Sequence, residues 1–141
     1  MARWAMLIVA AVLSLGALAT EPGVTVEEAW VREVPPGRDM SAGFLMLTNQ
    51  TDDTIALVRV ETEAARSVEL HSTRHEDGMM SMQRVLAYTL EPQSTHRLAP
   101  GGDHLMLIGL RESPARGDSI ALTLHFSDGS SRQISAEVRA N

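Results

Sequence analysis

Cysteine is absent from this chain of 141 residues. A blue-copper electron-transfer site needs a cysteine thiolate, and a thiol–disulfide oxidoreductase needs two cysteines, so the sequence excludes both classes. A lipid anchor attached to an N-terminal cysteine is not expected either. An exported protein remains compatible with the sequence, because a domain of this size can fold without disulfide bonds.

Lysine is also absent, so the 12 basic residues are all arginine, and they stand against 18 acidic residues. The formal charge is −6, and it becomes −7 if Arg3 is removed with the N-terminal segment discussed below. A surface with this charge disfavours binding to nucleic acids and to anionic membranes.

Familiar catalytic motifs are missing as well. The sequence contains no Gly-x-Ser-x-Gly, no His-Glu-x-x-His and no phosphate-binding P-loop. Paired carboxylates occur at Glu27-Glu28 and Asp52-Asp53, but adjacent residues of a strand point to opposite faces, and such pairs are usually solvated. The sequence therefore predicts a protein that is not an enzyme.

The N-terminal segment has the features of a secretory signal peptide. Arg3 precedes an apolar run from Met6 to Leu13, and Ala17-Leu18-Ala19 forms a small-x-small cleavage site. The apolar run is well short of the roughly 20 residues that a membrane span needs. We therefore expect a signal peptide at residues 1–19 and one mature domain at residues 20–141, located in the periplasm without a membrane anchor.

The mature segment reads as short strands separated by turn residues. No stretch holds a helical period for long, although residues 62–66 could form one helical turn. Alternation in Ile55 to Val60 puts Ile55, Leu57 and Arg59 on one side. Many short strands at near-regular spacing predict an all-β Greek-key β-sandwich. The expected strands are Val24 to Val31, Ser41 to Thr48, Ile55 to Val60, Val68 to His71, Met80 to Val85, Thr95 to Leu98, His104 to Leu110, Ile120 to Phe126 and Arg132 to Val138.

Two histidines and two methionines stand out by their chemistry, namely His71, Met82, His104 and Met106. Thioether sulfur is a poor ligand for most abundant metal ions, and monovalent copper is the main exception. His104 and Met106 are separated by one residue, so in a strand both side chains leave the same face, about 6.6 Å apart along the chain. The pattern favours a site for one Cu(I) ion.

Each of these residues also has a structural explanation. A single histidine beside a glycine-rich turn is usually solvated, and methionine is a common core filler. A metal-free sandwich that serves in adhesion or assembly, with these residues in its core and rim, is therefore an alternative. His75 fits a solvent-exposed turn residue better than an extra ligand for divalent copper, and Met40 could shield the metal.

The spacing His71-x10-Met82-x21-His104-x-Met106 resembles that of the periplasmic copper chaperones of the PCuAC family. The resemblance extends from about Val26 to Ile134. It singles out Met82 among its neighbouring methionines, because Met82 alone meets the spacing. The resemblance implies a cupredoxin-like β-sandwich that binds Cu(I), with these four residues as ligands.

The same resemblance implies a role in delivering copper for cytochrome oxidase assembly. The expected partner is the copper-receiving oxidase subunit or an assembly factor, and we expect the chaperone itself to be a monomer. A periplasmic protein that only buffers copper, without dedicated delivery, is the main alternative.

Overall fold

The computed structural model describes residues 23–140, and in this range the chain forms ten β-strands. The predicted signal peptide at residues 1–19 lies outside the described residues. None of residues 23–140 belongs to a helix that is long and apolar enough to cross a membrane. The strands are β1 (Val24–Arg32), β2 (Met40–Asn49), β3 (Ile55–Glu61), β4 (Ala65–Glu76), β5 (Met79–Val85), β6 (Tyr88–Leu90), β7 (Thr95–Leu98), β8 (His104–Leu110), β9 (Ser119–Phe126) and β10 (Ser131–Arg139).

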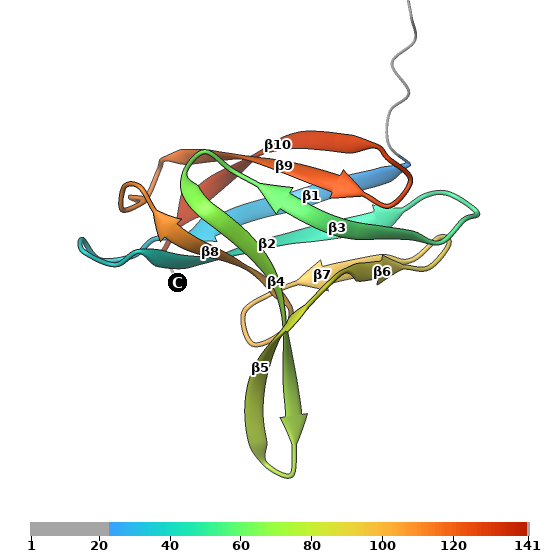
Figure 1. Ribbon diagram of the computed structural model, residues 1–141, viewed down its shortest axis with the longest axis horizontal. Coiled ribbons are helices and arrows are strands. Elements are labelled where there is room, and N and C mark those ends of the chain that lie inside the picture. The colour runs from blue at the N-terminus through green and yellow to red at the C-terminus, as the bar shows by residue number, and fades with distance from the viewer. Residues whose placement is uncertain (1–22, 141) are drawn as a thin grey trace, which may run out of the picture.

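Hydrogen bonds join the strands in the order β5-β4-β8-β2-β1-β10-β9-β3-β6, and β7 pairs with β2. This sheet folds back on itself, so that β3 also contacts β4 and β6 contacts β2. The first and last strands, β1 and β10, lie parallel, whereas the other pairs are antiparallel. The fold confirms the predicted all-β, cupredoxin-like Greek-key β-sandwich (Figure 1).

A core of leucines determines which residues face outward. In β8, Leu105 and Leu107 are fully buried, and because side chains alternate along a strand, His104 and Met106 take the outer face. Leu70 is buried in β4, so the side chains of the residues directly before and after it face outward. A slip of one residue in either strand would expose these leucines, so the core fixes the register between the two strands.

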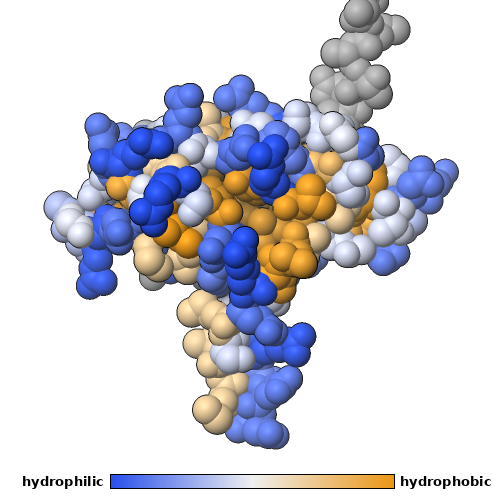
Figure 2. Space-filling view, viewed as in Figure 1, coloured by the Kyte–Doolittle hydropathy of each residue, from blue (hydrophilic) through white to orange (hydrophobic). Residues whose placement is uncertain are grey.

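The far end of β4 leaves the body of the sandwich together with β5. The two strands are joined by the two-residue turn Asp77-Gly78, whose φ angles of 50° and 74° are both positive, as a type I′ hairpin turn requires. We call residues 72–83 the hairpin arm. Figure 1 shows it projecting from the body, and Figure 2 shows weakly apolar residues along one side of it and hydrophilic residues along the other.

The structure corrects the predicted strands at three places. β4 continues five residues past His71, because the polar arm pairs with β5 without a buried face that alternation could reveal. The three-residue strand β6 was not predicted. The helical turn at residues 62–66 is wrong, since a tight turn there leads directly into β4 at Ala65.

Candidate metal centre

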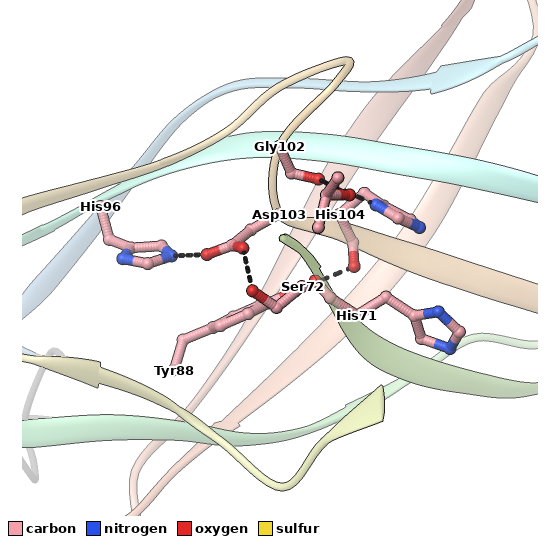
Figure 3. Close-up of polar contacts among 8 residues, drawn as sticks. His71, Ser72, Tyr88, His96, Gly102, Asp103 and His104 are labelled. Atoms are coloured by element: carbon pink, nitrogen blue, oxygen red, sulfur yellow. Dashed lines mark hydrogen bonds and ion pairs between the residues drawn. The ribbon is translucent and has the colours of Figure 1, made fainter. Parts of the chain in front are cut away.

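His71 and His104 lie directly opposite each other in the ladder between β4 and β8. Their ring centroids are 5.4 Å apart, and the rings are inclined at 45°. His104 is only 7% exposed, whereas the side chain of His71 is 18% exposed. Figure 3 shows the two imidazoles projecting to the same side. Both rings can therefore reach one ion held between them.

Met106 lies on the same face of this ladder. It is paired with Glu69 of β4, two residues before His71, and with Ala42 of β2. The half-buried Met106 side chain thus lies next to the histidine pair. The structure brings His71, His104 and Met106 together on the body of the sandwich.

Met82 lies on the hairpin arm and is not fixed against the other three. It is paired with Thr73, whereas His71 is paired with Arg84, so Met82 is a diagonal neighbour of His71 on the same face. Diagonal neighbours in a sheet are about 7–8 Å apart, within reach of a long side chain. Met82 is 59% exposed, so its thioether is accessible from outside.

Hydrogen bonds orient both imidazoles. Nδ1 of His104 donates to the carbonyl oxygen of Gly102 at 3.1 Å, which leaves Nε2 as the nitrogen with a free lone pair. Nε2 of His71 donates to Oε2 of Glu69 at 2.9 Å, which leaves Nδ1 free. The same hydrogen bond lowers the pKa of the Glu69 carboxyl below its ordinary value. Each ring therefore offers one nitrogen to a metal, in the manner typical of metal-binding histidines.

The loop before β8 is held by the arm and by β7. The carbonyl oxygen of Gly102, which orients His104, also accepts a hydrogen bond from Oγ1 of Thr73 at 3.0 Å. The Asp103 carboxylate accepts hydrogen bonds of 2.8 Å from Ser72 and from Nε2 of His96 (Figure 3). This network locks the loop that positions His104.

Tyr88 supports both histidines from behind. Its ring is 4% exposed, and its hydroxyl lies 2.6 Å from the carbonyl oxygen of His71 and 2.9 Å from that of His104. Burial raises the pKa of the Tyr88 hydroxyl above its ordinary value, so the group stays protonated and remains a donor. Tyr88 thus ties together the two backbone positions from which the imidazoles project.

We expect Tyr88→Phe to lower the free energy of unfolding by about 1 kcal/mol, the usual net value of a buried hydrogen bond. Urea denaturation of the metal-free protein measures this change. Thr95→Val is the matched control, because the Thr95 hydroxyl forms its hydrogen bond with Thr48 at an exposed position, and it should change stability by less than about 0.5 kcal/mol. Equal losses in the two variants would contradict the role assigned to Tyr88.

Two residues that the sequence suggested as possible additions to the metal site also lie on the outer face. Met40, which is 49% exposed, is paired with Ile108, two residues along β8 from Met106. His75 is exposed near the tip of the arm, where it is paired with Met80. Neither residue contacts the histidine pair through a hydrogen bond.

The sequence also matches known families. The family model described as "Putative lipoprotein LpqE-like" matches residues 24–138. A "putative lipoprotein" of Leifsonia xyli subsp. xyli is 37% identical over 118 residues, which are 83% of this chain and 70% of the relative. The residues matched by the family model include both strands of the histidine ladder and the arm.

Solved structures of copper-binding domains have the same fold. The copper-bound PCuAC domain from PmoF2 is 26% identical, with a TM-score of 0.72 over 84% of this chain and 94% of the domain. The solution structure of CuI-DR1885 from Deinococcus radiodurans is 35% identical, with a TM-score of 0.70 over 90% of this chain and 84% of that protein.

Proposed function

The chain belongs to the LpqE-like family and has the fold of the PCuAC domains, and on this premise we propose that it is a copper chaperone that binds one Cu(I) ion. The proposed ligands are His71, Met82, His104 and Met106. Such a protein moves an ion and catalyses no reaction. The observation that carries the proposal is the opposition of two oriented imidazoles, each with a free nitrogen, beside the thioether of Met106.

The donor set determines the proposed metal. Thioethers favour the soft monovalent ion, and the imidazoles add stronger donation without a thiol that could be oxidised. Two of the similar structures hold copper, namely the copper-bound PCuAC domain from PmoF2 and CuI-DR1885, and the second holds it as Cu(I). We therefore expect Cu(I) to be preferred over divalent zinc.

The accessibility of the site supports delivery of the ion. Met82 is 59% exposed, and the side chain of His71 is 18% exposed, so another protein can contact the ion before the last ligand releases it. We propose that the chaperone acts as a monomer in the periplasm. Its proposed recipient is the copper-receiving subunit of cytochrome oxidase or an assembly factor of that enzyme.

Transfer kinetics test delivery against simple buffering. Cu(I)-loaded protein is mixed with a soluble copper-receiving oxidase domain, and a small chelator of matched Cu(I) affinity serves as the comparison donor. We expect the transfer rate from the chaperone to rise with recipient concentration and to exceed that from the chelator, because the ion passes through a protein–protein complex. A rate that equals spontaneous release from the chelator would identify the protein as a copper buffer.

A further inference from the structure

The β5 strand carries three methionines in contact with solvent. Met79, Met80 and Met82 are 75%, 62% and 59% exposed. Figure 2 shows weakly apolar residues along the side of the arm that β5 forms. A patch of exposed apolar side chains is an informative feature of a protein surface, whereas a single exposed apolar residue is not. The proposed copper site uses only Met82, so the other two methionines need a separate explanation.

The register of the arm places Met80 directly opposite His75. The pair Glu76 and Met79 flanks the two-residue turn, and the turn's hydrogen bond makes it a hydrogen-bonded pair. Pairs alternate in an antiparallel ladder, so His75 and Met80 form a non-hydrogen-bonded pair, in which side chains approach most closely. Their Cβ atoms are expected to be about 4.5–5.5 Å apart. An imidazole and a thioether therefore meet at the tip of the arm.

This pair lies on the same face as the histidine ladder. His75 lies four positions after His71 in β4, and Met82 lies two positions after Met80 in β5, so all four side chains project from one face. Met82 lies between the tip and the ladder, with each step of two residues covering about 6.6 Å. Met79 projects from the opposite face of the arm. Each of the three successive pairs on this face, from the tip to the ladder, thus contains at least one soft donor, alongside Thr73 and Arg84.

The imidazole of His75 also has a nitrogen available for a metal. Nε2 lies 3.4 Å from the carbonyl oxygen of Gly101, to which it can only donate, so Nδ1 carries the free lone pair. Gly101 adjoins Gly102, whose carbonyl oxygen orients His104. The tip and the histidine ladder are thereby connected through the same loop.

We propose that His75 and Met80 form a capture site for Cu(I) at the tip of the arm, from which the ion passes by way of Met82 to the histidine pair. The transfer part of this inference rests on the proposed function. The ion stays monovalent throughout, so each step breaks one bond to nitrogen or sulfur as another forms, and no electron moves. A site with two protein ligands holds the ion more weakly than one with four, so the direction of transfer is inward.

The first test measures the tip site by itself. In the variant His71→Gln/His104→Asn, we expect Cu(I) alone to bind at one weaker site, with a shift of the Met80 methyl resonance in NMR spectra and no shift of the Met79 methyl. Adding His75→Gln and Met80→Leu should abolish this binding, whereas adding Met79→Leu should retain it. Equal Cu(I) binding with and without His75→Gln/Met80→Leu would overturn the capture site, whatever happens at the histidine pair of the unaltered protein.

The second test measures loading of the intact protein from a Cu(I)–chelator complex. We expect His75→Gln/Met80→Leu to slow loading about tenfold and to change the equilibrium affinity of the inner site less than about threefold, because the inner ligands are unchanged. Met79→Leu should load at the normal rate, since Met79 is more exposed than Met80 but faces away. Normal loading of His75→Gln/Met80→Leu would overturn the capture role, whereas failure of the unaltered protein to bind Cu(I) tightly would overturn the proposed function instead.

Discussion

Replacing His71 by glutamine and His104 by asparagine together should lower the Cu(I) affinity by at least about a thousandfold, equivalent to about 4 kcal/mol of binding free energy. The two imidazoles are the strongest donors of the proposed site. Without them, two thioethers remain, of which one is on the exposed arm. The protein should nevertheless stay folded.

The two replacements are chosen to keep the hydrogen bonds of the metal-free protein. The asparagine amide nitrogen occupies the position of histidine Nδ1, so His104→Asn can still donate to Gly102. The glutamine amide nitrogen reaches the position of Nε2, so His71→Gln can still donate to Glu69. Each replacement removes only the nitrogen that is free for a metal.

Competition with a Cu(I) chelator measures the affinity, and urea denaturation of the metal-free protein measures stability. His125→Gln is the control, because His125 also donates from Nε2 to a carboxylate, that of Glu61, but lies on β9 away from the arm. We expect this control to bind Cu(I) with unchanged affinity. If the double variant retains affinity within tenfold of the original, the histidine pair does not hold the ion.

Much of the sandwich could be predicted from alternation of apolar and polar residues. β7 and β8 have the predicted bounds, Thr95–Leu98 and His104–Leu110. In β8, the buried Leu105 and Leu107 alternate with outward-facing side chains, so one strand reveals both its core face and half of the candidate site. Alternation is informative here because one face of the strand consists of fully buried leucines, whereas the other carries a histidine and half-buried side chains.

Alternation failed where the backbone departs from a regular strand. In β3, the pattern placed Arg59 on the side of Ile55 and Leu57, but the register shifts between Leu57 and Arg59, and Val60 is buried instead. An extra residue in a bulge reverses the faces beyond it. No residue type in this segment indicates a bulge, so the sequence alone could not locate it.

The spacing of histidines and methionines led to the candidate site, but the groups that position it were missed. Tyr88 is 17 residues from His71 and 16 from His104, and it meets both only because β6 lies behind the ladder. Glu69 is different, because it precedes His71 by two residues in a strand and must share its face. That carboxylate could have been predicted from the sequence.

We expect replacement of both Met82 and Met106 by leucine to lower the Cu(I) affinity by about a hundredfold, equivalent to about 2.7 kcal/mol. Leucine has nearly the volume of methionine, so the packing is preserved, but it has no sulfur lone pair. The affinity for Zn(II) should change much less, because imidazole nitrogens are the donors that zinc uses in proteins. Competition experiments with each ion measure the ratio of the two affinities. An unchanged ratio would show that the thioethers do not contribute to the choice of metal.

The single variants Met82→Leu and Met106→Leu should lower the Cu(I) affinity by different amounts. Met106 is half-buried in the ladder beside His104, whereas Met82 is 59% exposed on the arm. Binding must immobilise the Met82 side chain, at an entropic cost of up to about 2 kcal/mol. The cost is smaller for Met106, because packing already restricts its side chain in the metal-free protein. Met106→Leu should therefore lower the Cu(I) affinity more than Met82→Leu. Met79→Leu, on the other face of the arm, is the matched control and should have no effect. The reverse order of the two single variants would mean that the arm is ordered against the histidine pair before the ion arrives.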